Sequence, residues 1–123
     1  MKILKTALVS VGLLIAGTGF AAAENWGAIA IGPNGAYGWS YDFPSRQAAE
    51  NAALSECGGR CQRKLSFADT CGAYATAQDA SGNIRAYGWA TRNSKEEAQM
   101  VAMQECSKYG QGCRVHVWAC TTR

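Results

Sequence analysis

The chain has 123 residues, of which 48% are hydrophobic and 17% are charged, and its formal net charge at pH 7 is +3. This length is enough for one small domain with a single core. Lysine and arginine are scattered and form no run. We therefore expect no nucleic-acid partner, because such a partner is held by a clustered basic surface.

Residues 1–23 have the pattern of a bacterial secretory signal peptide. Lys2 and Lys5 precede an apolar stretch over residues 7–20, and three alanines then supply a small-residue cleavage site. The alternative is a membrane anchor, which needs about 20 apolar residues, and this stretch is shorter. We expect a mature chain that begins at Glu24, is secreted or periplasmic, and carries no membrane anchor. Its formal net charge falls to about +1, since ten basic residues then face nine acidic ones.

The rest of the chain contains the same sequence pattern twice. Three blocks recur in the same order, at 26–30 and 71–75, at 36–40 and 86–90, and at 45–57 and 94–106. Such repetition is typical of a fold built from copies of one unit. It predicts a single domain over residues 24–123, made of two repeats at about 26–70 and 71–120.

Each repeat is predicted to fold as strand, strand, helix, strand. The first should have strands at 27–31 and 36–41, a helix over 45–57 and a strand at about 63–67. The second should have strands at 73–77 and 84–91, a helix over 94–106 and a strand at 114–119. The Asn34-Gly35 pair is a strong hairpin signal, and Ser45 and Ser94 are good helix N-caps. Two such units most simply form an α+β fold, with two tandem ββαβ repeats in one antiparallel sheet and both helices packed on one face.

All six cysteines follow the expected signal peptide. An even number in an exported chain predicts three disulfides. A zinc site is the alternative, but it needs closely spaced cysteine and histidine ligands, and the chain has one histidine. The bonds that we expect are Cys57–Cys61, Cys106–Cys113 and Cys71–Cys120. The first two would close helix-to-strand loops and the third would link the two repeats, while other pairings remain open.

The motifs together resemble DUF4189, a family of secreted bacterial domains of unknown function. The resemblance is carried by the W-G-A-I-A, Y-G-W-S and S-x-x-A-A-E-x-A-A-L-x-E-C motifs, by their counterparts in the second repeat, and by the closing C-R-V-x-V-W-A-C. It covers residues 26–120. It implies a small exported domain with paired cysteines, and some mycobacterial members are regarded as host-directed factors. No catalytic residues are agreed for the family, so none is transferred.

Aromatic side chains form the main candidate site. Tyr37 and Trp39 alternate along one predicted strand, and Tyr87 and Trp89 take the same places in the second repeat. One interpretation is a contact surface for a sugar, an envelope fragment or a partner protein. The other is core packing above the small residues of the helices, which we favour for most of these side chains.

The remaining chemistry centres on His116, the only histidine. A general base needs a nearby carboxylate or nucleophile, and the sequence identifies none. We expect no catalytic residue, no metal site and no cofactor. The function that follows is a non-catalytic binding or interaction module, such as an inhibitor, an immunity-type factor or a host-directed factor, with a protein or cell-envelope partner. The alternatives are a small secreted hydrolase that uses His116 with a nearby carboxylate, and a structural envelope protein.

Overall fold

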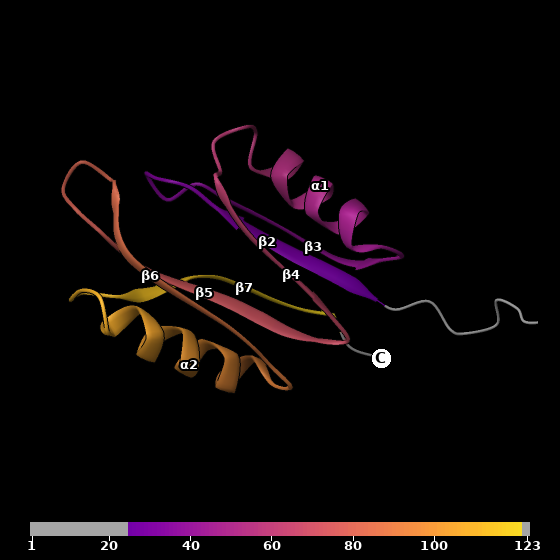
Figure 1. Cartoon of the computed structure of the whole chain (residues 1–123). Helices are drawn as coiled ribbons and strands as arrows, with labels where there is room; N and C mark the ends of the chain where they lie inside the picture. Colours follow the sequence, from indigo (N-terminus) through magenta and orange to yellow (C-terminus); the bar gives the residue numbers. More distant parts are fainter. Residues whose placement is uncertain (1–24, 122–123) are drawn as a thin grey trace, which may run out of the picture.

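The computed structural model describes residues 25–121, in which two ββαβ units follow each other along the chain (Figure 1). The first unit contains β2 (Trp26–Ile31), β3 (Tyr37–Phe43), α1 (Arg46–Glu56) and β4 (Arg63–Ala68). The second contains β5 (Thr70–Gln78), β6 (Ile84–Arg92), α2 (Lys95–Ser107) and β7 (Arg114–Thr121). The expected signal peptide lies outside the described residues.

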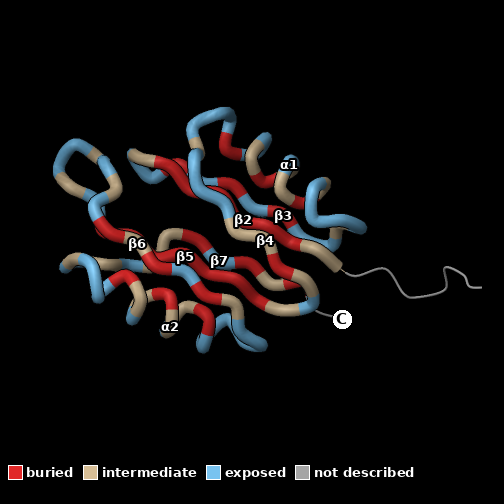
Figure 2. The backbone as a smooth tube through the Cα atoms, in the orientation of Figure 1, coloured by how far each residue is buried: buried red, intermediate tan, exposed pale blue. Residues whose placement is uncertain are grey.

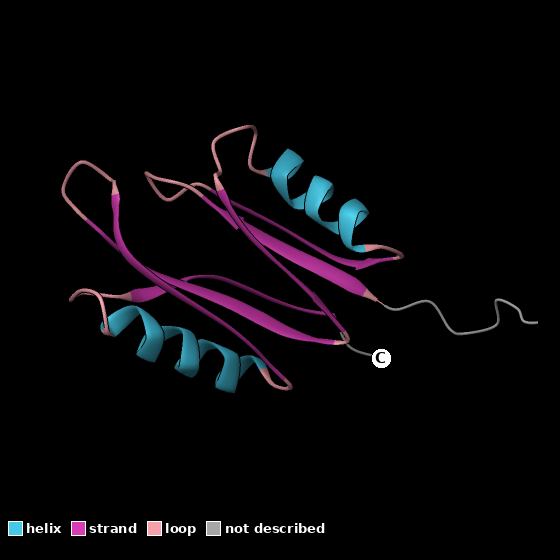
Figure 3. Ribbon diagram, in the orientation of Figure 1, coloured by secondary structure: helices cyan, strands magenta, loops and turns pink. Residues whose placement is uncertain are grey.

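The predicted α+β class and the tandem ββαβ units are confirmed, but the strands form two sheets. Each unit makes its own antiparallel three-stranded sheet, with strand orders β3-β2-β4 and β6-β5-β7. The sheets face each other and the helices cover their outer faces (Figure 3), so the expected single sheet with both helices on one face is wrong. The physical reason is that β2 and β5 are buried along almost their whole length on both faces. A sheet with one open face could not cover them.

Small residues fill the space between each sheet and its helix. The closest approaches are at Gly38 and Gly88, the middle residues of the two Tyr-Gly-Trp motifs. A Cβ atom added at Gly38 would lie 2.1 Å from the carbonyl oxygen of Ala53, and one at Gly88 would lie 2.2 Å from the backbone nitrogen of Cys106. In each motif the glycine therefore faces the helix, and the aromatic side chains beside it face the other way.

Both helices begin at the predicted serine caps. The side-chain oxygen of Ser45 accepts a hydrogen bond from the amide of Ala48 at 3.1 Å, and that of Ser94 accepts one from the amide of Glu97 at 3.1 Å. Each cap satisfies one amide that the first helical turn leaves without a partner. Within residues 25–121, no helix has the length and apolar composition that a membrane span requires.

Apolar side chains, all but one of them larger than alanine, form the core between the two sheets. They are Ile29, Ile31, Phe67, Tyr74, Val117 and Ala119. A Cβ atom added at Gly27 would come within 2.8 Å of the Phe67 ring, and one added at Gly72 within 2.6 Å. The ring thus occupies a gap that the central strands of both units leave open. Figure 2 shows the result, with buried segments along the facing strands and exposed segments in the loops.

Three disulfides are present, Cys57–Cys61, Cys71–Cys120 and Cys106–Cys113, and these are the pairs expected from the sequence. Cys71–Cys120, however, does not link the two units. Cys71 on β5 lies directly opposite Cys120 on β7 in the same sheet. The bond is internal to the second unit, because β5 is the first strand of that unit.

Hydrogen bonds at both ends of the facing sheets join the two units. At the hairpin end, the amide of Asn34 donates to the carbonyl oxygen of Gly82 at 2.8 Å. At the other end, the buried hydroxyl of Thr121 donates to the carboxylate of Asp42 at 3.1 Å, and the amide of Asp42 donates to the same hydroxyl oxygen at 3.3 Å. These bonds satisfy polar groups at the junction and set how the sheets align.

Candidate functional site

The first pair of predicted contact residues, Tyr37 and Trp39, lies on β3 with much of each side chain in solvent. Tyr37 is 50% exposed, Trp39 is 42% exposed, and Tyr41 further along the strand is 50% exposed. The strand register explains this position. Trp39 pairs with Ile29 on the face directed away from α1, while Gly38 takes the helix side. Core packing, the interpretation favoured from the sequence, is therefore wrong for Tyr37 and Trp39.

These rings border a groove of about 680 Å³ between β3 and β7, which we name the β3–β7 groove. Its ring-bearing side chains are Tyr37, Trp39, Tyr41, His116 and Trp118. The rings of Trp39 and Tyr41 are stacked, with centroids 5.4 Å apart and planes inclined by 13°. Trp118 is 41% exposed, and the ammonium of Lys95 lies 4.7 Å from its ring centroid. The groove thus presents flat apolar faces beside one cation.

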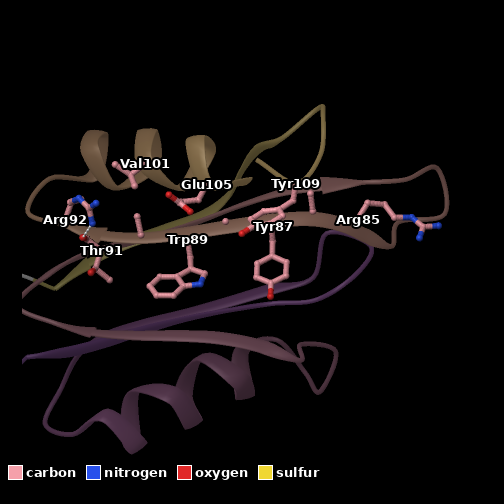
Figure 4. A pocket seen from close by; sticks show the side chains of 11 residues that line it. Arg85, Tyr87, Trp89, Thr91, Arg92, Val101, Glu105 and Tyr109 are labelled. Atoms are coloured by element: carbon pink, nitrogen blue, oxygen red, sulfur yellow. Dashed lines mark hydrogen bonds between the residues drawn. The ribbon is translucent and has the colours of Figure 1, made fainter. Parts of the chain in front are cut away.

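The second predicted pair, Tyr87 and Trp89, lies on β6 in the other sheet. Trp89 is 49% exposed, whereas Tyr87 is half-buried under the guanidinium of Arg63, 3.9 Å from its ring centroid. Both rings leave β6 on the side opposite α2 (Figure 4). They line a groove of about 710 Å³, the β6 groove, to which other chemistry-bearing residues also contribute, namely Arg85, Arg92, Glu105 and Tyr109. The four predicted residues are therefore divided between two grooves and form no single site.

His116 lies at an irregularity of β7. The register of β7 against β5 shifts between Tyr74 and Ala75, and His116 is the residue left without a direct partner. This is a β-bulge, which inserts one extra residue and re-aims its side chain. As a result His116 is directed towards the first unit and Val117 packs in the inter-sheet core.

Both ring nitrogens of His116 have partners within the fold. Nε2 is 3.1 Å from the carbonyl oxygen of Ala36, and Nδ1 is 2.9 Å from the hydroxyl oxygen of Thr76. A carbonyl only accepts, so Nε2 donates to Ala36, and in the neutral imidazole Nδ1 then accepts from the hydroxyl of Thr76. Burial lowers the pKa of His116 below its ordinary value, in agreement with this neutral form. Within residues 25–121 neither nitrogen is hydrogen-bonded to a carboxylate, and His116 serves as a link between the units.

The carboxylate of Asp79 orders its own loop. One of its oxygens accepts hydrogen bonds from the amides of Ser81 at 2.9 Å and Asn83 at 3.0 Å, and the other accepts from Nε of Arg85 at 2.8 Å. The bond from the Asn83 amide is the main cause that lowers the pKa of Asp79 below its ordinary value. This arrangement is that of a loop-forming residue. Among residues 25–121, no aspartate or glutamate lines the β3–β7 groove.

The sequence does not single out four of the groove residues, Trp118, Arg85, Arg92 and Tyr109. A signal for Trp118 exists, because the second repeat has one more residue between Arg114 and Cys120 than the first has at the matching segment, residues 63–68. An extra residue in one copy of a strand indicates a bulge there. The signal for the arginines is that they flank the Tyr-Gly-Trp motif in the second repeat alone.

Comparisons with known proteins agree with this fold. Protein Rv1269c of Mycobacterium tuberculosis and Protein Mb1300c of Mycobacterium bovis are each 36% identical to this chain over 99 residues, which is 80% of this chain and 72% of theirs. The NMR structure of Rv1813c from Mycobacterium tuberculosis is similar over 98% of this chain and 100% of that chain, with a TM-score of 0.55 and 23% identity, and shows the fold alone. Residues 26–120 match the family described as "Domain of unknown function (DUF4189)". The chain therefore belongs to the DUF4189 family.

Proposed function

We propose that this chain is a non-catalytic binding module that acts outside the cytoplasm and contacts a protein or cell-envelope partner through the β3–β7 groove. The observation that carries the proposal is the row of half-exposed rings on β3, Tyr37, Trp39 and Tyr41, which borders one groove with Trp118. Large aromatic side chains are typical anchors of contact surfaces, because a few of them supply most of the binding energy.

The groove is rigid enough to serve this purpose. Its rings are carried by β3 and β7, which belong to sheets that share one core. The stacking of Trp39 on Tyr41 holds both rings in one orientation before any partner arrives. A pre-ordered surface loses little side-chain entropy on binding, so more of the contact energy becomes affinity.

Two observations support a location outside the cytoplasm. The chain contains three disulfides, which form and persist in oxidising compartments. Residues 1–23 combine a basic start, an apolar stretch and a small-residue end, which is the pattern of an export signal.

The hydrolase alternative gains no support from the geometry. A general base needs a lone pair directed at substrate and a group that orients the ring. In His116 the Nδ1 lone pair accepts from Thr76, and Nε2–H is held by the backbone of Ala36. The histidine would have to break one of these bonds before it could move a proton.

Site-specific photo-cross-linking tests the proposal. A photoreactive residue replaces Tyr41 in the full chain, which is expressed in its own bacterium. A second variant carries the same residue in place of Met100, which is 54% exposed on α2. We expect one defined adduct in the envelope or culture fraction from the first variant, and its loss when Trp39→Ala is added.

The matched control is Trp89→Ala, which removes the equivalent indole from the other unit and should leave the adduct unchanged. Thermal unfolding of both tryptophan variants shows whether they are folded. The proposal fails if the Met100 position yields the same adduct, if the adduct survives Trp39→Ala, or if it arises in the cytoplasmic fraction alone.

A further inference from the structure

The outer edge of β6 has the shape of a docking site for another strand. β6 ends the strand order β6-β5-β7, and in the described part of the chain no strand pairs with its outer edge. The β6 groove follows this edge without a break, since every residue from Arg85 to Arg92 lines it. A groove that follows one strand over its length matches an extended peptide better than a compact ligand.

Alternate residues of β6 direct their backbone groups to this free edge. In an antiparallel pair, residues alternate between those that hydrogen-bond to the neighbouring strand and those that do not. The hydroxyl of Thr70 on β5 donates to the carbonyl oxygen of Arg92, so Arg92 belongs to the set that faces β5. The other set is Tyr87, Trp89 and Thr91. The carbonyl oxygen of Thr91 accepts a hydrogen bond from the guanidinium of Arg92 at 2.7 Å, which is consistent with a carbonyl directed away from β5.

The charge along the groove indicates which peptide fits. Arg85 and Arg92 lie at its two ends (Figure 4). Arg85 is paired with Asp79 at 2.8 Å, whereas Arg92 forms no ion pair within residues 25–121. The acidic residue that lines the groove, Glu105, is already paired with Lys108 at 2.9 Å. The positive charge of Arg92 is therefore available to a carboxylate of the occupant.

The equivalent edge of the first unit lacks these features. In the repeat, Gly35 and Asp42 stand at the places of the two arginines. Asp42 has a positive φ of 63° and is hydrogen-bonded to Thr121, which closes that end of β3. The groove along the β3 edge and α1 is also smaller, at about 430 Å³. The candidate site thus belongs to the second unit.

We propose that the β6 edge binds an extended acidic peptide by strand addition. The peptide backbone pairs with Tyr87, Trp89 and the N–H of Thr91, an acidic side chain meets Arg92, and apolar side chains contact Trp89 and Tyr109. A second copy of this chain suits the edge less well, because pairing two β6 strands would gather the arginines of both copies along one edge. This site is separate from the β3–β7 groove and goes beyond the function proposed above.

The experiment uses two synthetic peptides of about nine residues, the length of a long strand. Both alternate valine and threonine, but one has a glutamate at each end and the other a lysine. Each is titrated into the isotope-labelled, disulfide-bonded protein. We expect the glutamate peptide to shift the amide signals of Tyr87, Trp89 and Thr91, and to bind roughly tenfold more tightly than the lysine peptide. Equal binding of the two, no binding, or shifts confined to β3 and β7 would overturn the proposal.

Variants then distinguish the contribution of backbone pairing to peptide binding from that of the Arg92 charge. Thr91→Pro removes an N–H that points to the free edge and leaves the pairing with β5 in place. Thr91→Val keeps that N–H and is its control. We expect roughly tenfold weaker binding of the glutamate peptide by Thr91→Pro, and unchanged binding by Thr91→Val and by Tyr41→Val at the equivalent position of the first unit.

Arg92→Gln tests the role of the positive charge, and it should abolish the preference for the glutamate peptide. This exposed position decides the question if Thr91→Pro does not fold. Unchanged preference in Arg92→Gln would overturn the proposal. So would a dimer in sedimentation that Thr91→Pro dissolves, since that result would assign the edge to a second copy of the chain.

Discussion

The two units have the same fold, but the contact between the central strand and the third strand differs at one equivalent position. In the second unit, Cys71 and Cys120 lie opposite each other and form a disulfide. In the first unit the same places are held by Trp26 and Ala68, which are also opposite each other. The guanidinium of Arg46 lies 5.0 Å from the centroid of the Trp26 ring. One unit thus has a covalent bond at this place and the other an indole beneath a cation, so changes at the two places should lower the stability of the chain by different amounts.

Removing the covalent bond should give the largest effect. The double variant Cys71→Ala and Cys120→Ala should lower the free energy of unfolding by about 4 kcal/mol, because the bond spans a sequence separation of 49 and restrains the unfolded chain strongly. Cys57→Ala with Cys61→Ala is the matched control. Its bond spans a separation of 4, and about 2 kcal/mol should be lost. Urea unfolding measures both, and equal losses would contradict this account.

The shared glycines offer a change that should affect both units alike. Gly38→Ala and Gly88→Ala should each lower the free energy of unfolding by about 1 to 3 kcal/mol, because the added methyl group meets helix backbone and forces the helix away. Trp89→Ala, beside Gly88 but on the other face, should cost less. Thermal unfolding would rank the three variants by their loss of stability. A smaller loss in the glycine variants than in Trp89→Ala would mean that each helix can move away from its sheet at little cost.

His116 has no counterpart in the first unit, so its titration reports on a contact that only the second unit makes with its neighbour, the bond to Ala36. Burial lowers its pKa below 6.5, which means that the unfolded chain binds the proton more readily than the folded one. The stability that the neutral ring contributes is complete above that pH and is lost as the pH falls below it, by at most about 1.4 kcal/mol per pH unit. The difference in unfolding free energy between the protein and His116→Gln should therefore shrink on acidification. A difference independent of pH would show that the ring does not titrate in this way.

The smallest effect should come from the cations over the indoles of Trp26 and Trp118. Arg46 covers Trp26 in the first unit, and Lys95 covers Trp118 in the second. Each pair is at the surface, so Arg46→Ala and Lys95→Ala should lower the free energy of unfolding by about 0.5 to 1 kcal/mol. Chemical unfolding of both variants beside the parent protein measures this. A loss as large as that of the Cys71–Cys120 disulfide would show that the first unit depends on its cation far more than this geometry implies.

The features that could be predicted from sequence are those with local causes. Ser45 and Ser94 cap helices through bonds to their own first turns, and Asn34-Gly35 forms a turn within one hairpin. The pairing of the sheets could not be predicted in this way. Both faces of β2 are apolar, with Ile29 and Ile31 on one face and alanines on the other. The local sequence does not determine whether the face with the isoleucines packs against a helix or against a second sheet.

The candidate site was only partly predictable for a similar reason. The alternation of Tyr37 and Trp39 with glycine places both rings on one face, but their exposure depends on how far the opposite sheet extends over β3. That extent is set by contacts distant in sequence, such as the bond between Asp42 and Thr121. The bulge at His116 is visible only when the third strands of the two repeats are compared.

Phe67 makes the two halves of the chain dependent on each other. Its ring lies against Gly27 of its own unit and against the equivalent Gly72 of the other, while the place that corresponds to Phe67 in the second unit holds Ala119. Two copies of the first unit alone could not assemble in this manner, because a symmetric pair would bring two phenyl rings into a space that admits one. The two halves of the duplicated chain are therefore complementary and not interchangeable, because one half supplies the ring of Phe67 and the other has Ala119 at the matching place.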